Sequence, residues 1–151
     1  MKKAAIVLFL VVLSGCGGPA PTATPNLNTP AGYRQMAVGR GERVANAVIT
    51  TNASCSTEAI NQCQQTLKTQ EAVYAQQSEW LRIGTRPQQC DQIAANYSIL
   101  IESAKDYFKQ VNTSVAQNNQ AALRQTAKER MVSFNQSWNA FNNALSNDPC
   151  Q

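Results

Sequence analysis

The side chains best able to do chemistry in this chain of 151 residues are five cysteines, and the chain has no histidine. A thiol can bind a metal, attack an electrophile, form a disulfide or accept a lipid. Without an imidazole, the chain lacks the usual general base of a Cys-His or Ser-His catalytic site. No two cysteines have the Cys-x-x-Cys spacing of a zinc site, so no metal site is expected. The cysteines are Cys16, Cys55, Cys63, Cys90 and Cys150.

The first sixteen residues have the pattern of an export signal. Lys2 and Lys3 are positively charged, and residues 4–12 form an apolar run well short of the roughly 20 residues that a membrane-spanning helix needs. Leu13-Ser14-Gly15-Cys16 follows and resembles the lipobox of bacterial lipoproteins at all four positions. The resemblance implies that residues 1–15 are removed and that Cys16 becomes a lipidated N-terminus. The alternative is an ordinary secretory signal with a cysteine nearby by chance.

A lipid on Cys16 accounts for the odd number of cysteines. Four thiols remain, and outside the cytoplasm they are expected to pair as two disulfides rather than stay reduced. The expected location is a membrane surface outside the cytoplasm, with the protein held there by its lipid. Gly17 stands where an aspartate retains some lipoproteins at the inner membrane, so the resemblance favours the outer membrane or the cell surface.

Residues 16–30 are predicted to form a tether between the lipid and a domain at residues 31–151. The fourteen residues from Gly17 to Pro30 include four prolines and one large apolar side chain, too little apolar area to offset the entropy of ordering. Fully extended, such a segment reaches roughly 40 Å. Removal of Lys2 and Lys3 lowers the net charge from +4 to +2, so a nucleic-acid partner is not expected.

Apolar residues after residue 56 recur at helical spacing, which predicts three long helices at about 57–83, 87–117 and 120–147. Gly84 is expected to end the first of them and Pro87 to open the second. Asn118 and Asn119 have the types found in a helix–helix turn. Helices of matched length joined by short turns predict an all-α, antiparallel up-and-down bundle stapled by two disulfides.

A helix with a weaker sequence pattern is predicted before these three, and two interpretations of it remain open. Either one helix runs over about 30–52 with Gly39 and Gly41 at close helix contacts, or only residues 42–52 are helical. Thr29 and Pro30 have the types of an N-cap and a first helical residue, which favours the longer helix.

Bundle topology predicts the pairs Cys90–Cys150 and Cys55–Cys63. The third and fourth helices place Cys90 and Cys150 at one end, and the other two cysteines lie at the opposite end. Cys55 is expected to reach Cys63 only if the incoming loop folds back along the second helix. A bond from Cys55 to Cys90 or Cys150 would contradict the up-and-down arrangement.

Two surfaces are candidate binding sites, and each has a plainer reading. The first is the tip far from the tether, where residues 50–56 and 117–120 are also consistent with two solvated loops; the second is an apolar pocket, whose residues are also consistent with core packing. The tip residues are Asn52, Ser54, Asn118 and Asn119, and the pocket residues are Tyr74, Trp80, Tyr97, Phe134 and Trp138.

These features predict a membrane-anchored lipoprotein with a non-enzymatic binding or scaffold role in the cell envelope. The membrane is its partner through the lipid anchor, and an envelope protein is a candidate partner. The alternative is a small-molecule carrier or sensor that uses the pocket. Catalysis is not expected, because the carboxylates are scattered and no phosphate-binding loop is present. No cofactor is predicted other than the covalent lipid on Cys16.

Overall fold

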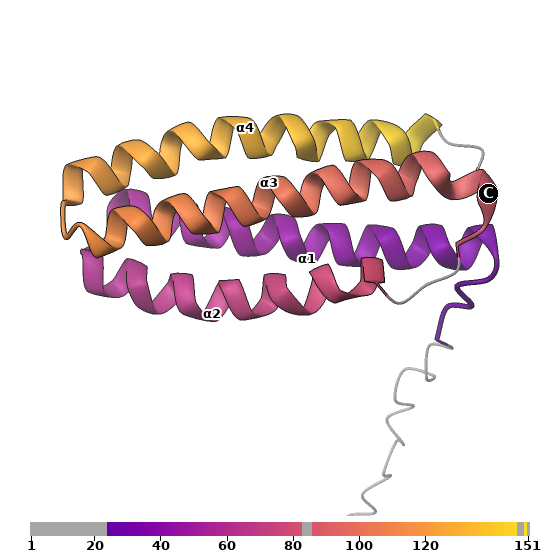
Figure 1. Ribbon diagram of the computed structural model, residues 1–151, viewed down its shortest axis with the longest axis horizontal. Helices are drawn as coiled ribbons and strands as arrows, with labels where there is room; N and C mark the ends of the chain where they lie inside the picture. The colour runs from indigo at the N-terminus through magenta and orange to yellow at the C-terminus, as the bar shows by residue number, and fades with distance from the viewer. Residues whose placement is uncertain (1–23, 83–85, 148–149, 151) are drawn as a thin grey trace, which may run out of the picture.

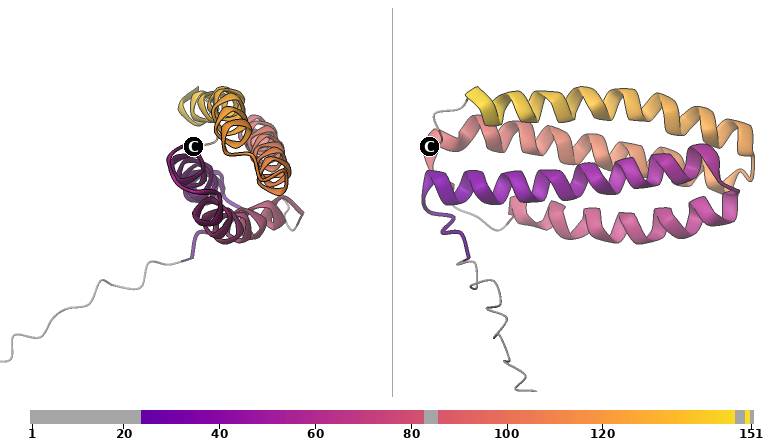
Figure 2. Two further views of the ribbon diagram at one scale, coloured as in Figure 1. Left: turned by 90° about the vertical axis from the view of Figure 1, so that its left-hand side faces the viewer. Right: turned by 180° about the vertical axis from the view of Figure 1, so that it is seen from behind.

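The computed structural model describes residues 24–82, 86–147 and 150, and it confirms the all-α bundle. The four long helices are α1 (Pro30–Thr57), α2 (Ile60–Ser78), α3 (Asp91–Ala116) and α4 (Gln120–Asn147), and two short 3-10 turns lie at Glu79–Arg82 and Gln88–Cys90. Figures 1 and 2 show the helices side by side and running alternately up and down. None of the described helices has a stretch long and apolar enough to cross a bilayer.

Helix α1 is continuous, so the longer of the two predicted readings is correct. The Thr29 hydroxyl accepts a hydrogen bond from the Gly32 amide at 3.2 Å, and Pro30 is the first helical residue. Leu27, within the predicted tether, packs against the core. We name the end of the bundle at which the chain enters α1 the tether end and the opposite end the distal end.

The prediction that the second helix starts near Thr57 is wrong, because α1 continues through the Ser/Thr-rich segment to that residue. The threonine hydroxyls of this segment donate hydrogen bonds to carbonyls one turn earlier in the helix. Thr51 donates to the Ala47 carbonyl at 2.8 Å, and Thr57 donates to the Ala53 carbonyl at 2.7 Å. Only two residues, 58 and 59, then separate α1 from α2. Cys55 therefore lies in the last turn of α1 rather than in a loop.

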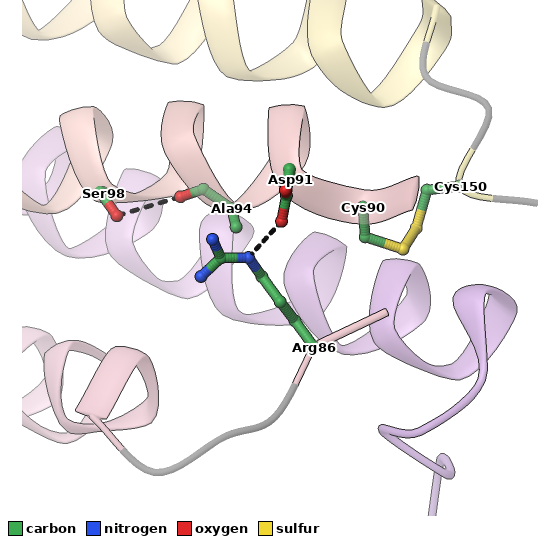
Figure 3. Close-up of polar contacts among 6 residues, drawn as sticks. All are labelled: Arg86, Cys90, Asp91, Ala94, Ser98 and Cys150. Carbon is green, nitrogen blue, oxygen red and sulfur yellow. Dashed lines mark hydrogen bonds and ion pairs between the residues drawn. A yellow bond between two sulfur atoms is a disulfide. The ribbon is translucent and has the colours of Figure 1, made fainter. Parts of the chain in front are cut away.

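Both predicted disulfides are confirmed. Cys55 pairs with Cys63 across the α1–α2 corner with 4.6 Å between Cα atoms, and Cys90 pairs with Cys150 at 4.8 Å. The second bond lies at the start of α3 (Figure 3). It ties Cys150 to the tether end.

The remaining helix boundaries follow the expected signals, with local differences. Helix α2 ends at Ser78, and a 3-10 turn follows it at Glu79–Arg82. The predicted end of this helix at Ile83 and Gly84 lies outside the described residues. Pro87 precedes a 3-10 turn rather than α3 itself. Asn118 has a φ of 51°, and the Asn119 side-chain oxygen accepts hydrogen bonds from the amides of residues 121 and 122, both at 3.1 Å. The predicted turn is therefore confirmed.

The core lies on the inner faces of all four helices, and α1 contacts each of the other three. Helix α1 contributes mostly small side chains, which lets its neighbours approach closely. At Gly41 an added Cβ would lie 2.3 Å from Cε1 of Phe141 on α4, whereas a Cβ at Gly39 would meet nothing within 4 Å. The predicted close helix contact therefore exists at Gly41 and not at Gly39. The largest fully buried side chains are Tyr97, Tyr107, Phe108, Phe134, Phe141, Leu67, Ile93, Leu100, Leu123, Val44, Val48 and Val111.

Helices α1 and α4 cap each other at both ends of the bundle. At the tether end, Arg34 on α1 donates from Nη2 to the Leu145 carbonyl in the last turn of α4 at 2.9 Å. At the distal end, Arg124 on α4 donates to the Thr57 carbonyl at 3.4 Å, and Gln120 donates to the Glu58 carbonyl at 2.9 Å. Both arginines thus lie near the negative end of a helix dipole.

Candidate functional site

The predicted pocket residues do not form one group. Trp80 and Tyr97 lie in contact with an edge-to-face arrangement and 5.1 Å between ring centroids, and Tyr97 in turn lies 5.7 Å from Phe141. Trp138 joins this group through Phe141 at 5.9 Å. Tyr74 lies elsewhere, against Phe108 at 5.4 Å, and Phe134 is fully buried.

The aromatic group around Trp80 and Tyr97 also includes two residues that the sequence analysis did not predict to line the pocket. Tyr33 on α1 lies 5.1 Å from Trp80, and Phe141 connects Tyr97 to Trp138. Tyr97 and Phe141 are fully buried, and Trp80 is 7% exposed. Rings at these distances fill the space between the helices, which is the arrangement of a packed core. Tyr33 could have been found only by assigning residues 30–41 to a helix, and Gly39 and Gly41 weaken the helical pattern there.

Arg40 covers one side of Trp80. Its guanidinium carbon lies 5.4 Å from the ring centroid, and its Nη1 donates to the Gln77 side-chain oxygen at 3.4 Å. Gln77 is itself 4% exposed, and its backbone carbonyl accepts a hydrogen bond from the Tyr97 hydroxyl at 3.2 Å. The Arg40 Nε atom is buried without a hydrogen-bond partner. This cluster joins α1, α2 and α3 by polar as well as apolar contacts.

Two buried tyrosines differ in how their hydroxyls are satisfied. Tyr97 has its hydrogen bond to Gln77, whereas the Tyr107 hydroxyl is buried with no hydrogen-bond partner. Burial raises the pKa of both phenols well above the ordinary value, although the nearby Arg40 cation partly lowers that of Tyr97. Both side chains therefore stay neutral at physiological pH.

Removing each hydroxyl is expected to change stability in opposite directions. Tyr107→Phe removes a buried hydroxyl without a partner and should raise the free energy of unfolding by about 1 kcal/mol. Tyr97→Phe removes the hydrogen bond to the Gln77 carbonyl, so it should lower that free energy by about 1 kcal/mol. Urea unfolding of the two variants at neutral pH checks this. Equal losses in both would mean that the Tyr107 hydroxyl has a partner in solution.

At the distal end, the structure corrects the predicted tip. Ser54 lies in α1, is 6% exposed and donates a hydrogen bond to the Glu58 carboxylate, so it offers no contact surface. Asn52 is half-buried on the same helix. Asn118 and Asn119 are exposed, but their types are explained by the turn between α3 and α4.

A groove opens at the tether end. It has a volume of about 590 Å³, and it is lined by four residues from the first turns of α1 together with the end of the chain: Ala31, Arg34, Gln35, Val38 and Cys150. Most of this lining is apolar, and Arg34 supplies a positive charge. The sequence did not predict the groove, because it depends on contact between residues more than a hundred positions apart.

A charged pair at the tether end lies on the surface. Arg86 donates from Nε to the Asp91 carboxylate at 2.6 Å, close to the Cys90–Cys150 bond (Figure 3). The two side chains are 51% and 58% exposed, so solvent weakens the pair, and its contribution to stability is small. Asp91 is the first residue of α3, where a negative charge suits the helix dipole.

The part of the chain that is described contains no cluster of side chains suited to metal binding. Its four cysteines are all in disulfides, and no three Asp, Glu, Cys or His side chains there lie close enough to hold a metal ion. Comparison of the chain with protein-family models, with curated proteins and with solved structures finds no match.

Proposed function

We propose that this chain is a bacterial lipoprotein, lipidated at Cys16 and held outside the cytoplasm, whose helical bundle has a non-enzymatic binding or scaffold role in the cell envelope. The observation that carries the proposal is the Leu13-Ser14-Gly15-Cys16 motif after a short apolar run. The location at the outer membrane or cell surface rests on the same motif and on Gly17.

The two disulfides support an oxidising compartment. All four of their cysteines are fully buried, and disulfides persist in secreted and surface proteins rather than in the reducing cytoplasm. The fifth cysteine, Cys16, is thereby left for the lipid.

A binding or scaffold role is favoured over a carrier role by the packing of the aromatic residues. The rings of Trp80, Tyr97 and Trp138 lie against Tyr33 or Phe141 at ordinary contact distances. A carrier would need these rings to enclose a ligand rather than one another. A scaffold needs only a rigid body with accessible outer faces, which the bundle and its two cross-links supply.

Lipidation is tested by Cys16→Ser in the full-length chain expressed in a bacterium. The unchanged protein should incorporate radiolabelled palmitate and sediment with membranes, whereas Cys16→Ser should lose the label and the membrane association. A variant with Cys55→Ala and Cys63→Ala is the control, because these cysteines are in a disulfide and their loss should leave the label in place. Labelled or membrane-bound Cys16→Ser protein would contradict the proposal.

A partner at the distal end is tested by a photo-activated cross-linker at Gln117. This residue is exposed and precedes the α3–α4 turn, so it reports on the tip without altering the conformation at Asn118 or the cap at Asn119. The same cross-linker at Gln92, exposed near the tether end of α3, is the control. Cross-linking to one envelope protein from the first position alone would support the scaffold role at this tip, and equal products from both positions would contradict it.

A further inference from the structure

The groove at the tether end combines an apolar lining with one positive charge. Ala31, Val38 and the disulfide-bonded Cys150 supply apolar walls, Gln35 is exposed at its side, and Arg34 lines it with a half-buried guanidinium. A lipid headgroup region presents the complementary chemistry: a negative phosphate beside an apolar glycerol and chain.

The Arg34 guanidinium is held in place while one edge stays unpaired. Its Nε and Nη2 both donate to the Leu145 carbonyl, at 3.3 and 2.9 Å. Its Nη1 makes no hydrogen bond, and the side chain makes no ion pair, with any residue in the described ranges. A fixed, weakly hydrated guanidinium with free N–H groups suits phosphate, because little side-chain entropy is lost when the phosphate binds.

We propose that this groove binds the headgroup of an anionic phospholipid in the membrane that carries the anchor. The inference rests on the proposed function, since the lipid on Cys16 would bring this end of the bundle to the membrane. Leu27 packs against the core and the Thr29 amide donates to the Asn26 carbonyl, so residues 17–25 set the reach of the tether, which is roughly 30 Å when they are extended. Figures 1 and 2 show the end of the bundle at which the chain enters α1, and the groove lies at that end.

The groove has weak affinity on its own, because it holds a single cation. One basic residue near an anionic membrane surface contributes about 1 kcal/mol, which corresponds to about a fivefold change in binding. On the anchored protein the membrane is always present at high local concentration, so weak binding is enough to orient the bundle. The groove therefore acts as a second, non-covalent contact that sets how the bundle stands on the membrane.

The test uses the mature chain, residues 16–151, with Cys16→Ser so that no lipid anchors it. Sedimentation with vesicles of phosphatidylcholine, with and without phosphatidylglycerol, measures binding at low and high salt. We expect binding to vesicles that contain phosphatidylglycerol to exceed binding to phosphatidylcholine alone by about fivefold, and salt to remove most of the difference. Equal binding to both vesicles would overturn the proposal.

Two matched pairs of variants locate the contact. Gln35→Glu places a negative charge at the groove, whereas Gln64→Glu makes the same change on the exposed face of α2 near the distal end. Arg34→Gln and Arg124→Gln each remove an arginine that caps a helix carbonyl, at opposite ends of the bundle. The first member of each pair should lower binding about fivefold and the second should leave it unchanged.

Two further outcomes would overturn the groove as the binding site. Equal effects of the two members of both pairs would show a general charge effect and overturn the groove as the site. A loss with Arg34→Gln but not with Gln35→Glu would also overturn it, because the capped carbonyl rather than the groove would then explain the loss. These measurements use unlipidated protein, so their failure leaves the palmitate result intact, and loss of palmitate labelling leaves them intact in turn.

Discussion

Replacing both Cys90 and Cys150 with alanine is expected to lower the free energy of unfolding by about 4 kcal/mol. The bond joins residues 60 positions apart, so it removes a large loop-closure entropy from the unfolded chain. It also ties Cys150 to the residue that precedes α3 at the tether end. Urea unfolding followed by circular dichroism measures the loss, and a raised m-value should accompany it because the unfolded chain becomes less compact.

The second disulfide is the matched control. Cys55 and Cys63 are only 8 positions apart, so replacing both with alanine should cost about 2.5 kcal/mol in the same measurement. All four cysteines are fully buried, so the two double replacements remove similar apolar contacts. An equal cost for the two pairs would mean that native-state packing, rather than loop entropy, determines the contribution of these bonds.

The pairing of the cysteines was predictable because it follows from topology. Once three helices of similar length were expected to alternate in direction, Cys90 and Cys150 had to lie at the same end. The turn between α3 and α4 was predictable for a local reason, since an asparagine at positive φ and an asparagine cap are recognisable from residue types. Helix α3 was predictable from the helical spacing of its apolar residues.

The end of α1 was not predictable from local signals. A segment rich in serine and threonine normally indicates a loop, because hydroxyl side chains compete for backbone hydrogen bonds. Here Thr51 and Thr57 instead donate to carbonyls one turn earlier within the helix. The buried disulfide of Cys55 then holds that turn against α2. Tertiary contacts therefore override the local preference of these residues.

The candidate sites were predicted less well than the fold. Trp80, Tyr97 and Trp138 belong to one aromatic group, but Tyr33 and Phe141 complete it from α1 and α4. The tether-end groove depends on Arg34 meeting the carbonyl of a residue 111 positions away. Contacts of this kind depend on how α1 and α4 are placed against each other, and spacing within one helix does not report that.

Gly41→Ala is expected to lower the free energy of unfolding by about 2 kcal/mol, although alanine is the better helix former. The added methyl group would lie 2.3 Å from Cε1 and 3.0 Å from Cζ of Phe141, so either the ring or the α1 backbone has to move. Phe141 is fully buried and contacts both Tyr97 and Trp138, so its ring cannot shift without disturbing those contacts. Thermal and urea unfolding of the variant measure the loss.

Gly39→Ala is the control on the same helix, two residues earlier. An added Cβ there meets nothing within 4 Å, so the variant should gain up to about 1 kcal/mol from helix propensity alone. A double-mutant cycle isolates the ring contact: Phe141→Leu leaves more room beside Gly41 and should reduce the cost of Gly41→Ala. If both alanine variants were stabilised, or if Phe141→Leu left that cost unchanged, the close approach of α1 to α4 at Gly41 would be wrong. The opposite signs expected at two glycines of one helix would arise from tertiary packing, because helix propensity favours alanine at both.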